Sequence, residues 1–218
     1  MNFHPDNCQC FFCTTTVHAG FISTRIAGTD GVSLETLKWA KVLEKQGIKS
    51  FYFAGELETP SQRSYLCERA HFKNPEIRFI FRNCFGNRQR KRSVTKKIHT
   101  LTEELKDELY KFIRTHDIDI LIPQNAITIP LNIPLGLAIT EIISETGMPV
   151  IAHHHDFFWE RTHFLTNPVW EYLNMGFPPH LPTIHHVVIN SSADNQLGLR
   201  TGVSSTIIPN VMDFENPP

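Results

Sequence analysis

Three histidines and an aspartate, His153–Asp156, directly follow the short apolar run Pro149–Ala152. Imidazole changes charge near neutral pH, so it can act as an acid, a base, a hydrogen-bond partner or a metal ligand. Because side chains alternate along a strand, we expect His153 and His155 on one side and His154 on the other. The next residues are aromatic, which favours a packed segment over an exposed turn. We therefore predict that His153 or His155 faces a ligand, with Asp156 as a further candidate binding residue.

Two metal sites are alternative interpretations. Adjacent histidines at a strand end lack the H-x-x-x-H spacing that places two imidazoles on one face of a helix. At the N-terminus, Cys8, Cys10 and Cys13 could bind zinc with His4 or His18 as a fourth ligand. However, C-x-C-x-x-C is not a standard zinc-finger spacing, and no second cysteine pair follows. We expect reduced thiols on a tail instead, and no bound metal.

The turn Gly28–Ser33, with the sequence GTDGVS, is a second candidate for ligand binding. Its two glycines permit a tight turn, and a helix predicted to start at Ser33 would direct free N–H groups and partial positive charge outwards. An ordinary strand-to-helix turn would have the same residues, and the segment is neither G-x-G-x-x-G nor a P-loop. The candidate binding residues of this turn are Gly28, Thr29, Asp30, Gly31 and Ser33.

Strands that alternate with amphipathic helices must position these residues. We predict strands at residues 21–28, 50–55, 77–81, 117–123, 149–155, 185–190 and 204–211. We predict helices at residues 33–47, 64–72, 94–116, 134–147 and 191–202, the last capped by Ser191 or Ser192. The strands are rich in Ile, Val and Phe, as expected for parallel strands buried on both faces. The sequence therefore predicts a doubly wound, Rossmann-like α/β fold of about seven mainly parallel strands with helices on both faces.

In such a sheet, ligands bind at the carboxyl ends of the strands where the strand order reverses. Three polar stretches follow predicted strands: AGTDGVS at residues 27–33, PQNAIT at residues 123–128 and HHHDFFWER at residues 153–161. We expect all three to meet in one cleft.

Composition limits the classes of partner. The chain has 218 residues, 41% hydrophobic residues and a formal net charge of −1, so no overall charge attracts it to nucleic acid. With no membrane-spanning run and no signal-peptide pattern, we expect a cytoplasmic protein. The stretch Arg82–Lys97 has seven basic and no acidic residues. It is either a solvated loop or a region of peripheral contact with an anionic membrane or another polyanion.

Three stretches together resemble one enzyme family. Residues 21–57 resemble the opening of a family 4 glycosyltransferase, in which a glycine-rich loop follows the first strand. PVIAHHHDFFWER resembles a strand of that family that ends in a histidine. Residues 187–214 resemble the close of its N-terminal domain, so the resemblance covers residues 21–214.

The resemblance implies one half of a GT-B arrangement of two facing Rossmann-like domains. Residues 1–20 would be a cysteine-containing tail, residues 21–214 the N-terminal acceptor-binding domain and residues 215–218 the start of an interdomain linker. The missing C-terminal domain would bind a nucleotide-sugar donor. The sugar would pass to a hydroxyl acceptor with retention of configuration and without metal or cofactor, and this part alone would be inactive.

The resemblance also implies roles for individual residues. His155 would be the histidine that reaches the transferred sugar, with His153 as the competing assignment. Gly28–Gly31 would line the donor phosphates and the acceptor, and Asn125 would face the acceptor. Two other classes stay open: a stand-alone sugar- or nucleotide-binding module, and a Cys/His metal-binding interaction protein.

Overall fold

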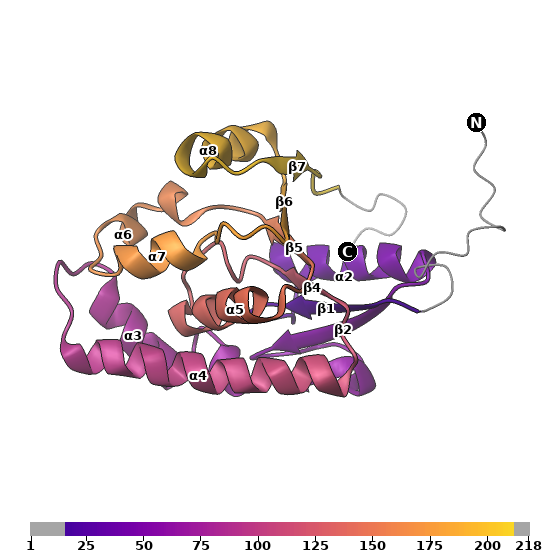
Figure 1. The fold of residues 1–218 in the computed structure, drawn as a ribbon, viewed down its shortest axis with the longest axis horizontal. Coiled ribbons are helices and arrows are strands. Elements are labelled where there is room, and N and C mark those ends of the chain that lie inside the picture. Colours follow the sequence, from indigo (N-terminus) through magenta and orange to yellow (C-terminus); the bar gives the residue numbers. More distant parts are fainter. Residues whose placement is uncertain (1–15, 212–218) are drawn as a thin grey trace.

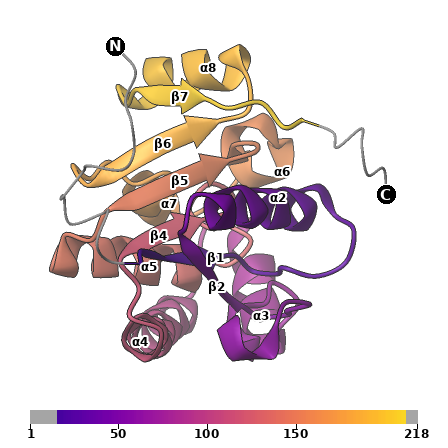
Figure 2. The same cartoon turned by 90° about the vertical axis from the view of Figure 1, so that its right-hand side faces the viewer.

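The computed structural model describes residues 16–211, which contain a seven-stranded sheet in the order β3-β2-β1-β4-β5-β6-β7. All neighbouring strands in it are parallel, and Figure 2 shows them from β2 to β7 across the molecule. The strands are β1 (His18–Ile22), β2 (Lys49–Ala54), β3 (Ser64–Leu66), β4 (Ile120–Pro123), β5 (Val150–His154), β6 (Ile184–Val188) and β7 (Ser205–Ile207). The predicted Rossmann-like fold class is confirmed.

Helices cover both faces of this sheet. They are α2 (Gly31–Lys45), α3 (Pro75–Cys84), α4 (Arg92–Thr115), α5 (Ile133–Thr146), α6 (Thr162–Leu165), α7 (Trp170–Gly176) and α8 (Ser191–Thr201). Apolar side chains of α4 and α5 pack on one face of the central strands. Those of α2 pack on the other face, so the central strands lie between two helical layers (Figure 1). The predicted long helix at residues 94–116 corresponds to α4.

The strand order reverses between β1 and β4. From β1 the chain moves outwards through β2 to β3 and then returns to β4 on the other side of β1. At such a switch point the two chain directions leave a crevice at the carboxyl ends of the strands. The segments that follow β1 and β4 therefore lie side by side.

Successive side chains of β1 pack alternately against the two helical layers. Phe21 packs in the cluster beneath α2, and Ile22 packs in the cluster beneath α4 and α5. Gly20 faces the α4 side, where an added Cβ would lie 2.9 Å from the ring of Phe112. Only a glycine lets that ring approach the strand so closely.

Two predicted elements were wrong, and the first strand lies earlier than predicted, at His18–Ile22 instead of residues 21–28. Residues 77–81 form part of α3 and not a strand, because Ile77, Ile80 and Cys84 recur at helical spacing and are all buried. Asn74 caps this helix through a bond from the Glu76 N–H. The predicted helix at residues 64–72 is instead the edge strand β3 followed by a short 3₁₀ turn.

Two predicted helix starts were also wrong. Asp30, and not Ser33, caps α2: its carboxylate accepts from the N–H groups of Val32 and Ser33. Asn190, and not Ser191 or Ser192, caps α8 by accepting from an N–H in its first turn. In each case a side chain one residue before the helix reaches the free N–H groups.

Candidate functional site

The histidines at the end of β5 divide as the alternation predicted. The rings of His153 and His155 lie with their centroids 4.4 Å apart on one side of the strand. Both contact the same atom, Gln124 Oε1, at 3.0 Å from His153 Nδ1 and 3.2 Å from His155 Nε2. A carbonyl oxygen only accepts hydrogen bonds, so each of these ring nitrogens donates. His154 points to the opposite side, against Thr128 and His186.

Burial separates His153 from His155. His153 is 0% exposed, and its ring stacks on Trp39 with centroids 4.4 Å apart. His155 is half-buried, and its Nδ1 lies 3.4 Å from the side-chain nitrogen of Asn210. Of the two candidates, His155 is therefore the one that a ligand can contact.

Both rings are neutral at pH 7. Burial, aided by the neighbouring His155, lowers the pKa of His153 to about 3. Burial also lowers the pKa of His155, while the carboxylates of Glu35, Asp156 and Asp30 act in the opposite direction. A neutral imidazole has one donor and one acceptor nitrogen, which suits it to hydrogen-bond a hydroxyl-rich ligand.

Asn125 joins the ends of β4 and β5. Its backbone has φ = 57°, in the left-handed region that asparagine tolerates better than most residues. Its N–H donates to the His153 carbonyl at 3.0 Å, and its side-chain oxygen accepts from the His155 N–H at 3.0 Å. Its side-chain amide donates to Asp156 at 2.9 Å. Asn125 thus fixes the position of His155 through the backbone.

Asp156 is held from two sides. One carboxylate oxygen accepts from Asn125, and the other pairs with Arg161. The carboxylate is half-buried and lies close enough to His155 to raise its pKa against the effect of burial.

The turn before α2 is organised around Asp30. Its carboxylate accepts from the Ser33 hydroxyl at 2.7 Å and pairs with Arg25 at 2.8 Å. Burial would raise the pKa of Asp30, but the bonds from Ser33 and Arg25 outweigh it and lower the pKa. Ser33 is fully buried, and its hydroxyl also accepts from the Ala27 N–H.

The glycine-containing part of this turn is exposed. Gly28 has φ = 70°, so the predicted tight turn depends on it, and its N–H donates to Glu58 at 2.8 Å. Thr29 and Gly31 are exposed, and Gly31 is the first residue of α2. Polar backbone at the start of a helix therefore borders the switch point.

Two of the three polar stretches line one cavity, and the third, which follows β5, contacts them through hydrogen bonds but does not line it. A cavity of about 180 Å³ lies at the switch point between β1 and β4; we call it the switch-point cavity. Its lining comes from the segment after β1, the start of α2 and the segment after β4: Ser23, Thr24, Arg25, Asp30, Val32, Phe72, Gln124, Asn125, Ala126, Ile129 and Leu131. The β5 stretch joins this group through the bonds of Gln124 and Asn125 to His153, His155 and Asp156.

Several residues of this site were not predicted individually. Gln124 is 0% exposed, and its position between the two histidines follows only from the pairing of β4 with β5. Its side-chain nitrogen and His153 Nε2 are buried without a hydrogen-bond partner among the described residues. Trp39, Arg25 and Phe72 come from α2 and from two loops. PQNAIT was the one sequence signal, since it places Gln124 directly after a strand.

Within residues 16–211, no three His, Cys, Asp or Glu side chains are arranged to hold a metal ion. The candidate ligands Cys8, Cys10 and Cys13 lie outside the described residues, as do residues 215–218. Cys67 and Cys84 are free and buried, and burial raises the pKa of Cys84 to about 11, which keeps its thiol protonated.

No helix among the described residues is long and apolar enough to cross a membrane. The basic stretch is partly used in packing, because Arg90 pairs with Glu171 and Lys97 with Glu76. Membrane contact through this stretch stays a prediction, as does location in the cytoplasm.

The strand order and the polar residues at the switch point define a Rossmann-like α/β domain with a polar cavity at the carboxyl ends of its strands. The chain is 36% identical over 192 residues to a protein of Thermotoga maritima named mannosylglucosylglycerate synthase. It is 32% identical over 201 residues to a protein of the same name from Petrotoga mobilis. These alignments cover 86% and 89% of this chain but only 43% and 45% of the relatives.

Among solved structures, the lipopolysaccharide outer core galactosyltransferase WaaB in its apo form aligns with 90% of this chain and 46% of its own, with a TM-score of 0.48 and 11% identity. An alpha-glucosyltransferase in complex with UDP-glucose and abasic-site DNA covers 88% of this chain and 41% of its own, with a TM-score of 0.45 and 11% identity. No family model matches the chain.

Proposed function

We propose that this chain is the acceptor-binding half of a glycosyltransferase. One observation carries the proposal: polar residues that follow β1 and β4 line the switch-point cavity, and two of them, Gln124 and Asn125, hydrogen-bond the histidine stretch that follows β5. That cavity belongs to a chain with 36% and 32% identity to two proteins named mannosylglucosylglycerate synthase.

The relatives' name also suggests the acceptor. A product named mannosylglucosylglycerate has a mannosyl group joined to a glucosyl unit that is itself joined to glycerate. We infer that the acceptor for this chain is glucosylglycerate, or a closely similar sugar acid, and that the transferred group is mannosyl.

His155 is proposed as the residue that contacts the transferred sugar. It is half-buried, and its neutral ring is oriented by Asn210 and by Gln124, which lines the switch-point cavity. In sugar transfer with retention, positive charge develops on the sugar ring, and hydrogen bonds formed at that moment lower the barrier. His153, fully buried and stacked on Trp39, would instead fix Gln124 in place.

The donor is proposed to bind elsewhere. A nucleotide sugar would occupy a second Rossmann-like domain that faces this one in a GT-B arrangement, and the relatives are long enough to contain one. Transfer then needs both domains to hold the two substrates in near-attack geometry. We expect no metal requirement, and no turnover by these 218 residues alone.

Calorimetric titration of the 218-residue chain tests this proposal. We expect saturable binding of glucosylglycerate, no binding of GDP-mannose at similar concentrations, and no sugar transfer when both are present. Tight GDP-mannose binding without glucosylglycerate binding would contradict the acceptor assignment and favour a nucleotide-binding module. Transfer by this chain alone would contradict the two-domain mechanism.

A further inference from the structure

A second pocket, of about 440 Å³, lies next to the switch-point cavity; we call it the basic pocket. It is lined by Phe72, Lys73, Arg78, Phe81, Arg82 and Leu131. Arg78 and Arg82 are four residues apart on α3, so they lie on the same face of that helix. Lys73 immediately precedes Asn74, the residue that caps α3. One short stretch of chain therefore supplies all three cations.

The charge of the basic pocket is not neutralised by the described residues. Lys73, Arg78 and Arg82 are exposed, and none forms an ion pair with a carboxylate of residues 16–211. Glu76, the acidic residue of α3, pairs with Arg69 and Lys97 instead. A concave surface whose charged side chains are all positive attracts an anion.

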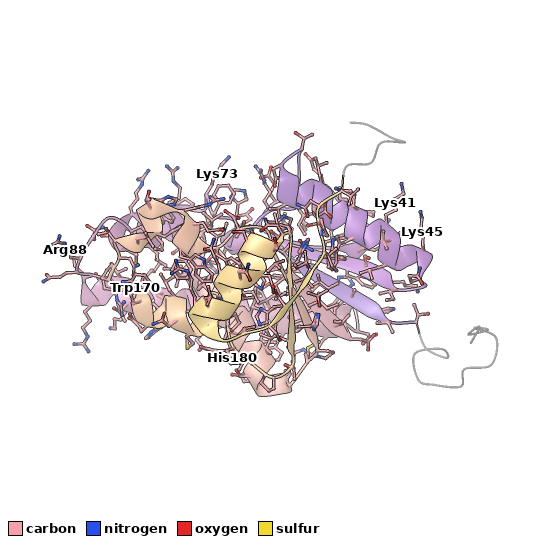
Figure 3. All side chains as sticks on the ribbon, turned by 90° about the horizontal axis from the view of Figure 1, so that it is seen from above. Lys41, Lys45, Lys73, Arg88, Trp170 and His180 are labelled. Carbon is pink, nitrogen blue, oxygen red and sulfur yellow. The ribbon has the colours of Figure 1, made fainter. Side chains whose placement is uncertain are left out.

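The basic pocket and the switch-point cavity share two walls, Phe72 and Leu131. The Phe72 ring lies between them, with Arg25 6.0 Å and Lys73 5.7 Å from its centroid. Arg25 is already paired with Asp30, whereas Lys73 forms no ion pair with any residue from 16 to 211. A ligand that extends from the cavity along Phe72 would therefore bring its far end to Lys73, Arg78 and Arg82. In Figure 3, Lys73 lies near the amino-terminal end of α2, well away from Lys41 and Lys45.

We propose that the basic pocket binds the carboxylate of a sugar-acid acceptor whose sugar hydroxyls lie in the switch-point cavity. This inference rests on the proposed function and identifies Arg78, Arg82 and Lys73 as the residues that select an acidic acceptor. Guanidinium groups pair with a planar carboxylate through two parallel hydrogen bonds. The rings of Phe72 and Phe81 offer apolar faces to the carbon side of the ligand. Phosphate can use the same donors, so the test must separate the two anions.

The test compares glucosylglycerate with glucosylglycerol, which has a CH₂OH group in place of the carboxylate. Binding of each to the 218-residue chain is measured by calorimetry in low salt. We expect the chain to prefer glucosylglycerate by about tenfold or more, because charge-assisted bonds are stronger than neutral ones. Arg78→Gln/Arg82→Gln should remove this preference while leaving glucosylglycerol binding unchanged. Lys73→Gln should reduce it in part.

Lys41→Gln/Lys45→Gln is the matched control. It also removes two exposed cations, but from the part of α2 that lies away from Lys73 (Figure 3), and it should keep the preference. Equal binding of both ligands by the unaltered chain would overturn the basic-pocket assignment and leave the proposed function standing. Binding of neither would overturn both.

Phosphate competition and vesicle binding distinguish the proposed sugar acid from other anionic ligands. Inorganic phosphate should compete with glucosylglycerate only at much higher concentration. If the arginine double variant lost phosphate binding and kept glucosylglycerate binding, the pocket would be a phosphate site and the proposal wrong. The proposal would also be wrong if that variant lost only its binding to phosphatidylserine vesicles.

Discussion

The two faces of β5 carry histidines that are neighbours in sequence but have opposite surroundings. His153 and His155 both contact Gln124, which lines the switch-point cavity. His154 is fully buried, with Nε2 2.9 Å from His186 Nδ1 and Nδ1 bonded to Thr128. Burial lowers the pKa on both faces, so ionisation does not separate their roles. Solvent accessibility separates them: His155 is partly accessible, whereas His154 is a polar side chain within the core.

The largest expected effect is on stability as the pH falls. Burial lowers the pKa of His153 to about 3, that of His186 to about 4, and that of His154 as well. In the unfolded chain the same groups bind protons near pH 6.5. Below that pH the unfolded state therefore takes up more protons than the folded state, and the unfolding free energy decreases as the pH is lowered. Each group should cost about 1 to 2 kcal/mol of unfolding free energy between pH 7 and pH 5.

Denaturant unfolding at a series of pH values measures this effect. Stability should be greatest above pH 6.5 and should decrease from there towards pH 4. His186→Gln keeps a polar side chain that does not titrate, so its curve should be flatter. An unfolding free energy that did not change between pH 7 and pH 5 would show that these histidines are not buried as neutral groups.

The next largest expected effect is on catalysis, and it comes from the side of β5 that carries His155. In an assembled enzyme that contains both halves, His155→Ala should lower kcat by about a hundredfold, or about 3 kcal/mol of barrier. The melting temperature should change little, because His155 is only half-buried. His163→Ala, at an exposed histidine of α6, is the control and should keep kcat. A large loss for His153→Ala with none for His155→Ala would reverse the assignment of the two residues.

The core side should respond in the opposite way. His154→Ala leaves His186 and Thr128 without their shared partner and opens a cavity, so it should cost about 2 kcal/mol of stability. Turnover per folded molecule should stay close to normal. His185→Ala, at an exposed histidine of β6, should change stability by less than about 0.5 kcal/mol. Equal stability losses for His154→Ala and His185→Ala would contradict the assignment of His154 to the core.

The division of the histidines was predictable because strand alternation is a local property. The helix α3 was not predicted, because Ile77, Phe79 and Ile80 favour strand by type. Asn74 followed by a proline was the available signal for a helix start. Because residues 77–81 were predicted as a strand, the basic pocket could not be predicted either: Arg78 and Arg82 are close neighbours on one face only if the segment is a helix. Gln124 could not be assigned because its role depends on pairing between distant strands.

The smallest effect concerns the N-terminal cysteines, which lie outside the described residues. If Cys8, Cys10 and Cys13 are tail thiols, deletion of residues 1–13 should leave the melting temperature nearly unchanged. Stoichiometric zinc in the purified protein, with unfolding on addition of a chelator, would contradict this prediction, because a structural metal contributes folding energy directly.

Histidine side-chain NMR during a titration with glucosylglycerate tests the central claim most directly. In the ¹⁵N-labelled 218-residue chain, the imidazole signals of His155 should shift with saturable dependence on the ligand. The signals of His154 and His186 should stay in place, because that pair is buried on the other face of β5. Shifts at His154 and His186 with none at His155 would contradict the assignment of the cavity face as the acceptor site.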